Sequence, residues 1–401
     1  MIADTPTGST RPPPDPKPAF PPPFTACTCR RLTRDPNPHG SKNRVILKKP
    51  IPHGLSADDC VAMYRAMVLT RAYDDRGFKL QRQGRIGFYA GSFGEEATQI
   101  GTAYAGDEAD WYFTSYRQPG IALFRGLPLQ TMMDNLFCNS RDVVKGRQMP
   151  VHYTGRQQHF LSVSSVIGTQ IIQGVGCAMG IKIKGDRGVV FTYLGDGATS
   201  ANDFHSGMNF AGVTKAPVIF VLVNNQYAIS TPLSKQTAVE VLADKAKAYG
   251  FLGIQVDGND VLAVYAAAMD AKRRAEAGEG PTLLELKTYR AGPHSSSDDP
   301  SRYRTEEQTQ HWLERDPLTV LKNHMISFGI WDDTYETCFV EEANAMLGDA
   351  VKQAEAVGEP SWDTLFTDVY TYKSQTLADQ EQDIMAHEQG LDLKNEGEFP
   401  L

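Results

Sequence analysis

Two polar side chains follow apolar runs of the sequence, at positions where a metal ion could be bound. Asp196 follows the run 189–194 and one glycine, and Asn225 follows the run 216–223 and a further asparagine. Such runs are typical of buried parallel strands, and the segment 198–214 between them is predicted to be a crossover helix. Ligands of open α/β sheets bind at the carboxyl ends of the strands. Asp196 and Asn225 therefore offer hard oxygen atoms for magnesium or calcium, which would hold a phosphorylated cofactor.

An arginine and a histidine in two loops are further candidates for chemistry. Arg117 lies in the segment 114–120, and its planar guanidinium group can donate two hydrogen bonds to a phosphate. His294 lies in the polar loop 291–303, beside a cluster of serines. A histidine next to serines suggests a hydrolase triad, but the sequence has no GxSxG motif, so we reject that class. From the residues alone, His294 is either a surface side chain or an acid–base group.

The hydrophobic pattern predicts the elements that position these residues. A third strand is expected at 282–289, directly before the loop, and a helix is expected to begin after Ser56, a favourable capping residue. The region 306–377 is predicted to be mostly helical. Strands that alternate with helices indicate an α/β fold with a doubly wound, mainly parallel sheet and helices on both faces.

The segment 174–180 has the glycine spacing of a dinucleotide-binding fingerprint. The residues before it do not make a convincing strand, and no acidic residue follows at the expected distance on a strand end. We therefore predict a helix whose small residues allow close packing. A nicotinamide dehydrogenase is the rival class, and it would bind NAD independently of magnesium.

Composition excludes several kinds of partner. The 401 residues carry a formal net charge of −8, which argues against nucleic acid because phosphate binding needs a basic surface. No apolar run approaches about 18–20 residues, and no apolar signal-peptide core is present, so we expect no membrane contact. The expected location is the cytoplasm, or the mitochondrial matrix in a eukaryote.

Several longer motifs, together with the strand-end residues, resemble the thiamine diphosphate-dependent 2-oxoacid dehydrogenases. The resemblance is to the α subunit of the branched-chain enzyme and extends over about residues 45–370. The motifs that carry it are 83–89, 94–96, 114–120, 145–152, 164–170, 195–197, 224–225, 227–232, 256–260, 288–303 and 365–370. Val223 departs from the pattern, because animal relatives have an arginine there.

Composition and the resemblance together divide the chain into three parts. Residues 1–45 are rich in proline and are expected to form a disordered arm. Residues 46–377 are expected to form the thiamine diphosphate-binding α/β domain with a helical C-terminal part. Residues 378–401 are polar, and we expect a loosely ordered tail.

The resemblance also implies roles for individual residues. Magnesium would be held by Asp196, Asn225 and the backbone carbonyl of Tyr227. Thiamine diphosphate would contact Tyr116, Arg117, Ser165, Ile167, Asp196, Gly197, Ala198, Asn225, Arg290 and His294, with His294 as the catalytic residue. Potassium would be held by Ser164, the carbonyl of Val166, Thr169 and Gln170. The substrate pocket would include Phe88, Tyr116 and Ile167.

Ser295, next to His294, matches the position that mitochondrial kinases phosphorylate in this family. A phosphate there would add negative charge beside the diphosphate of the cofactor, and the two would repel each other.

The family resemblance implies partners and a reaction. The chain would pair with a β subunit in an α2β2 heterotetramer, and it would be inactive alone. The assembly would decarboxylate a branched-chain 2-oxoacid, such as 3-methyl-2-oxobutanoate, and transfer the acyl group to the lipoyl group of an acyltransferase component. The alternatives are the α subunit of pyruvate dehydrogenase and a non-catalytic regulatory subunit with the same fold.

Overall fold

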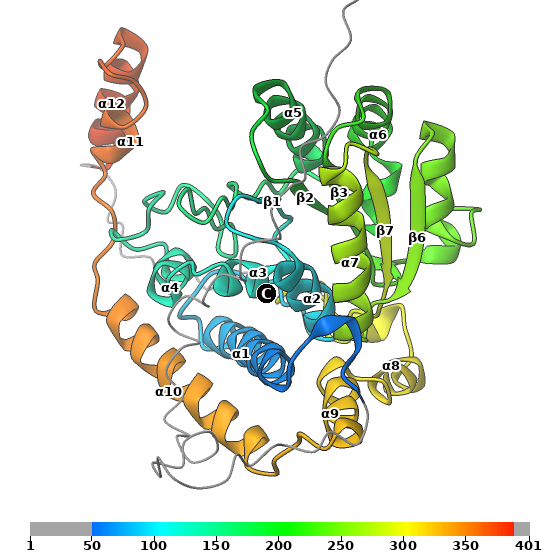
Figure 1. Cartoon of the computed structure of the whole chain (residues 1–401). Helices are drawn as coiled ribbons and strands as arrows, with labels where there is room; N and C mark the ends of the chain where they lie inside the picture. Colours follow the sequence, from blue (N-terminus) through cyan, green and yellow to red (C-terminus); the bar gives the residue numbers. More distant parts are fainter. Residues whose placement is uncertain (1–49, 389–401) are drawn as a thin grey trace, which may run out of the picture.

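The computed structural model describes residues 50–388, and its centre is a five-stranded parallel sheet (Figure 1). In spatial order the strands are β1 (Trp111–Phe113), β2 (Val190–Gly195), β3 (Val218–Asn224), β7 (Thr282–Lys287) and β6 (Leu252–Asp257). The three strands predicted from the sequence are therefore neighbours, in the order β2, β3 and β7. The predicted proline-rich arm lies outside the described residues.

Helices cover both faces of the sheet, because alternate residues of the strands point into two separate cores. Phe191 and Tyr193 of β2 lie in the core that includes α1, α2 and α7, whereas Val190 and Leu194 lie in the core that includes α5 and α6. These helices are α1 (Ala57–Arg82), α2 (Glu96–Ala105), α5 (Thr169–Lys184), α6 (Asn202–Thr214) and α7 (Val261–Glu276). The predicted doubly wound α/β fold is confirmed.

The C-terminal part of the described chain is mostly helical, as predicted. The remaining α-helices are α3 (Pro119–Phe124), α4 (Leu129–Phe137), α8 (Glu306–Leu313), α9 (Pro317–Phe328), α10 (Tyr335–Glu355), α11 (Thr364–Thr367) and α12 (Gln375–Glu388). Helix α12 stands away from the sheet (Figure 1). Residues 378–388 of the expected polar tail continue this helix, and residues 389–401 lie outside the described part.

Two local predictions concern helix ends and helix packing. Ser56 caps α1 by accepting a hydrogen bond from the Asp59 backbone at 3.1 Å, and the Asp59 carboxylate accepts one from the Ser56 backbone at 2.7 Å. In α5, a side chain at Gly174 would collide with the Thr192 hydroxyl, so the helix does approach the sheet closely there. The expectation of close packing holds only at this glycine, because Gly176 and Gly180 face open space.

No helix within residues 50–388 is both long enough and apolar enough to span a lipid bilayer.

Candidate active site

The ends of β2 and β3 place Asp196 and Asn225 side by side. The register of the two strands pairs Gly195 with Val223, so the residues that follow them leave the sheet at the same edge. Asp196 starts a short 3-10 helix (Asp196–Ser200), and its side chain is buried. Burial raises the pKa of Asp196, while hydrogen bonds from the Gln236 amide at 2.6 Å and from the Asn225 backbone oppose this shift.

A tight hairpin brings the carbonyl of Tyr227 back to the same edge. Strand β4 (Tyr227–Ala228) pairs with β5 (Thr231–Pro232), and Ile229 in the turn between them has a positive φ of 56°. Gly197 must be small, because a β-carbon there would lie 2.6 Å from that of Ala228. The turn after β2 and the hairpin after β3 are therefore packed against each other.

The donor set at this edge fits a magnesium ion and an anionic cofactor. Asp196 offers a carboxylate, Asn225 a carboxamide and Tyr227 a carbonyl, all of which are hard oxygen ligands. Nη1 of the buried Arg290 donates to the Tyr227 carbonyl at 3.1 Å, which leaves that oxygen a second lone pair. The buried Nε atom of Arg290 has no hydrogen-bond acceptor among residues 50–388. A bound anion would supply that acceptor.

Arg117 and His294 contact each other close to Arg290 of the same site. The Nη2 atom of Arg117 donates to the carbonyl oxygen of His294 at 3.0 Å and lies 3.1 Å from its Nδ1 atom. Nη1 of Arg117 donates to the carbonyl of Gly91. Burial, then the charges of Arg117 and Arg290, lower the pKa of His294 to about 3. His294 is therefore neutral at physiological pH and accepts at Nδ1, so its proton is on Nε2.

The loop that carries His294 is folded down onto the domain. The Asp298 carboxylate accepts hydrogen bonds from the His294 backbone and from the Tyr303 hydroxyl, both at 2.6 Å. Nη2 of Arg290 donates to the same hydroxyl at 2.8 Å, and the Ser296 backbone donates to the Tyr89 carbonyl at 2.8 Å. These contacts connect His294 to Arg290, which also donates to the Tyr227 carbonyl.

Ser295 is buried in this closed loop. It is only 6% exposed, and its hydroxyl lies 3.1 Å from that of Ser297. A modifying enzyme can therefore reach the Ser295 hydroxyl only after the loop has opened.

The segment expected to hold potassium forms a turn that leads into α5. The Ser164 hydroxyl accepts from the Val166 backbone at 3.2 Å, and the Val166 carbonyl accepts from the Thr169 backbone at 3.4 Å. The Gln170 amide nitrogen donates to the carbonyl of Tyr193 on β2 at 2.8 Å. The turn brings Ser164, Val166 and Thr169 together, and a potassium ion there stays a prediction.

The residues expected in the substrate pocket are only partly brought together. Phe88 and Tyr116 are half-buried against the first core, and the ring of Tyr116 lies 6.1 Å from that of His294. Ile167 is 50% exposed on the surface of this chain. Ser165 also lies at this surface, and the side chain of Ala198 packs into the second core.

The structure adds two residues for which no role was predicted. The Nε2 atom of His152 lies 2.5 Å from the Ser165 hydroxyl, and burial lowers the pKa of His152. Glu95 is buried beneath Asn225, and its carboxyl accepts a hydrogen bond from the Asn225 side chain at 2.7 Å. Both residues lie in motifs of the family resemblance, 94–96 and 145–152, which is the one signal that could have found them.

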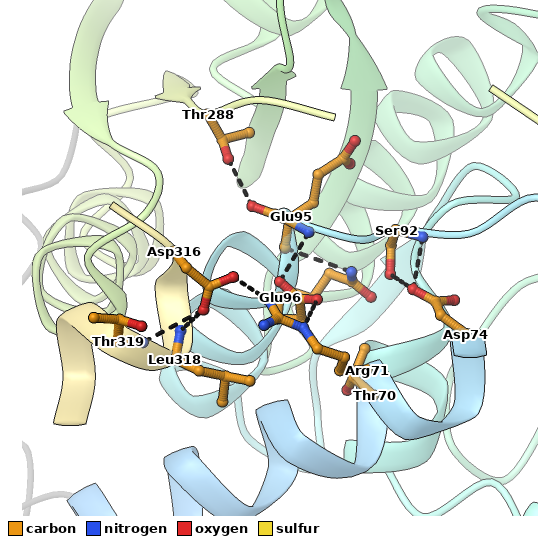
Figure 2. Close-up of polar contacts among 12 residues, drawn as sticks. Thr70, Arg71, Asp74, Ser92, Glu95, Glu96, Thr288, Asp316, Leu318 and Thr319 are labelled. Carbon is orange, nitrogen blue, oxygen red and sulfur yellow. Dashed lines mark hydrogen bonds and ion pairs between the residues drawn. The ribbon is translucent and has the colours of Figure 1, made fainter. Parts of the chain in front are cut away.

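Adjacent carboxyl groups point in opposite directions at the start of α2. Figure 2 shows the Glu95 carboxyl directed away from Glu96 and Arg71. Glu96 is fully buried and accepts from Nε of Arg71 at 2.9 Å, and Nη2 of Arg71 lies 2.8 Å from Asp316. This ion cluster connects α1, α2 and the start of α9 below the site, so it fixes the segment from which Glu95 projects.

Known proteins resemble this chain over most of its length. Residues 64–362 match the family model described as dehydrogenase E1 component. The mitochondrial 2-oxoisovalerate dehydrogenase subunit alpha of Bos taurus is 41% identical over 362 residues, which cover 90% of this chain and 78% of the relative. Its Homo sapiens counterpart is 40% identical over 362 residues, covering 90% and 80%. The pyruvate dehydrogenase E1 component subunit alpha of Staphylococcus aureus is 42% identical over 340 residues, covering 84% and 90%.

Proposed function

The chain belongs to the dehydrogenase E1 component family, and from this membership we propose that it is the α subunit of a thiamine diphosphate-dependent 2-oxoacid dehydrogenase. Its partner is a β subunit, in keeping with the α-subunit names of its relatives. The observation that carries the proposal is the convergence of Asp196, Asn225 and the Tyr227 carbonyl beside Arg117 and His294. A non-catalytic subunit would have no need of this oxygen-rich edge.

The residues of the site have separate roles in this proposal. Asp196, Asn225 and the Tyr227 carbonyl hold magnesium, and Arg117 binds the diphosphate group. When bound, thiamine diphosphate supplies the carbon nucleophile and the electron sink that decarboxylation of a 2-oxoacid requires. His294 carries its proton on Nε2, because Nδ1 accepts from Arg117, and it acts as a hydrogen-bond donor during acyl transfer. A potassium ion at Ser164 and its neighbours stabilises the turn before α5.

For the substrate, we propose a branched-chain 2-oxoacid such as 3-methyl-2-oxobutanoate, with the acyl group passed to the lipoyl group of an acyltransferase component. The support is the resemblance of the 145–152 and 288–303 motifs and the relatives named for 2-oxoisovalerate. Pyruvate is the second candidate, because the Staphylococcus relative is 42% identical. The two acids differ by two methyl groups, and one methylene changes discrimination by about 1–3 kcal/mol, so kcat/KM for both must be compared in the assembled complex. Equal values would overturn the branched-chain assignment.

Two further proposals concern regulation and location. Phosphorylation of Ser295 would place a charge beside His294 and prevent the loop from closing on the cofactor. We place the chain in the cytoplasm, or in the mitochondrial matrix if the source is a eukaryote.

The test is calorimetry of thiamine diphosphate binding, with and without magnesium, by the chain assembled with a β subunit. We expect binding that depends on magnesium and is lost in Asp196→Ala. The matched control is Asp186→Ala, which removes an exposed carboxylate before the opposite end of β2 and should bind normally. Absence of binding in a verified assembly of the unmodified chain would favour the non-catalytic alternative.

A further inference from the structure

Glu95 is a buried carboxyl group at the start of α2 that no step of the proposed reaction uses. It is 1% exposed, and its Oε1 atom lies 2.7 Å from the side-chain nitrogen of Asn225. The two residues come from different elements, because Asn225 follows β3 and Glu95 precedes α2. Their contact is therefore a direct connection between the helix layer and the predicted metal-binding edge of the sheet.

This contact determines which end of the Asn225 amide faces the metal site. A carboxamide can be rotated by half a turn with little change of shape, yet only its oxygen can bind a magnesium ion. Glu95 offers oxygen acceptors to Asn225, so it attracts the NH2 group and leaves Oδ1 on the opposite side. The other polar contact of the amide is weak, since the Tyr227 backbone donates to Oδ1 at 3.3 Å.

The position of Glu95 is itself fixed by its neighbours. Gly94 has a φ of +93°, its nitrogen donates to the Glu96 carboxyl at 3.1 Å, and its carbonyl accepts from the Thr288 hydroxyl at 2.9 Å. Arg71 holds Glu96 on the far side, so the two acids cannot exchange places (Figure 2). Backbone and side-chain contacts thus aim the Glu95 carboxyl at Asn225.

The contact does not depend on the charge of Glu95. Burial raises the pKa of Glu95 to about 7, against the charges of Arg117 and Arg290 and the hydrogen bond from Asn225, which lower it. In both protonation states one carboxyl oxygen can accept from the Asn225 amide.

We propose that Glu95 is a positioning residue for the metal site, which orients Asn225 so that its oxygen faces the ion. The proposal rests on the proposed function, because it requires that Asn225 be a metal ligand. Partners of this kind, one step removed from a metal, typically change its affinity by about 10- to 100-fold when they are mutated.

The experiment measures Mn²⁺ binding by electron paramagnetic resonance, in the α/β assembly with thiamine diphosphate present. We expect Glu95→Ala to weaken Mn²⁺ binding by about 10- to 100-fold, because the Asn225 amide is then free to rotate. Glu95→Gln keeps an oxygen acceptor at the same distance, and its affinity should remain close to that of the unmodified chain. This rescue separates loss of the acceptor from loss of charge.

The control is Asp110→Asn, which alters a buried acid that precedes β1 and so lies at the opposite edge of the sheet. It should lower the thermal unfolding midpoint, because it weakens the ion pair with Lys272, and leave Mn²⁺ binding unchanged. Unchanged affinity in Glu95→Ala would overturn the positioning role, and so would equal weakening in Glu95→Gln or in Asp110→Asn. If the unmodified assembly binds no Mn²⁺ with the cofactor, the proposed function fails instead.

Discussion

One nitrogen atom of Arg117, Nη2, contacts both the carbonyl oxygen of His294 at 3.0 Å and its ring nitrogen Nδ1 at 3.1 Å. A guanidinium nitrogen can only donate, so Nδ1 must be the acceptor and the histidine must be neutral. The same arginine thus holds the backbone of the loop and selects the tautomer of its histidine.

Acid should open the loop at 291–303. The pKa of His294 is about 3 in the closed loop and 6.5 when free, so the open form takes up a proton at a higher pH than the closed form. The contribution of His294 to closure is complete above about pH 6.5 and is lost as the pH falls toward 3. Hydrogen exchange of the loop amides, corrected for intrinsic rates, should be faster at pH 5.5 than at pH 7.5. His294→Gln should remove the difference, and a difference that persists would contradict the assignment.

Arg117→Lys should weaken cofactor binding although it keeps the positive charge. A lysine ammonium group cannot reproduce the fork that reaches both Gly91 and His294. A misplaced cation would lose one or two charge-assisted hydrogen bonds to the diphosphate, each worth about 1.5–3 kcal/mol. Calorimetry of the assembly should therefore show an affinity for thiamine diphosphate at least about tenfold lower. Arg156→Lys, at an exposed position, is the matched control. Equal affinities in the two variants would show that charge alone suffices.

Ser295→Asp should disorder the loop, and Ser301→Asp should not. Ser295 is buried, so a carboxylate there would be desolvated and would push the segment out. Ser301 belongs to the same loop but is exposed. Limited proteolysis should cut the first variant within 291–303 and spare the second, and 2-oxoacid turnover should fall only in the first. Similar cleavage of both would mean that charge anywhere in the loop opens it.

Asp316→Ala should destabilise the α/β domain, because it breaks the ion cluster at the start of α9. The Asp316 side chain caps α9 by accepting from the Leu318 backbone at 3.0 Å, and it lies 2.8 Å from Arg71. Loss of a helix cap costs about 1 kcal/mol, and loss of a partner in a buried ion cluster adds to this cost. We therefore expect the free energy of unfolding, measured with urea, to fall by about 2–4 kcal/mol. Asp316→Asn retains the cap and should recover about 1 kcal/mol. If the two variants unfold alike, the cap contributes nothing.

The sequence was sufficient for the centre of the sheet and for the residues at its edge. The apolar runs of β2 and β3 are typical of strands buried on both faces, and β7 is rich in leucine, so all three were predicted. β1 has only three residues (Trp111–Phe113), and β6 is an edge strand that is only partly buried, so neither has a run of that kind. Helix α12 was missed because its composition is polar and, as Figure 1 shows, it stands away from the sheet.

The site could be predicted only where its residues are determined locally. Asp196 and Asn225 were found because each directly follows a strand, and the strand ends fix their positions. Glu95 and His152 contact residues that lie in other segments of the chain, and no local sequence pattern predicts such contacts. The closed conformation of the His294 loop likewise depends on tertiary contacts with Arg117 and Tyr89.

The contacts that complete the site span long stretches of chain. Glu95 meets Asn225 across 130 positions, and Arg117 meets His294 across 177. Closing such long loops costs conformational entropy before the contacts stabilise the fold. We therefore expect these two contacts to form late and slowly during folding. The chain should therefore acquire its secondary structure well before it can retain a cofactor. No fragment shorter than the span from Glu95 to His294 can contain both of these pairs.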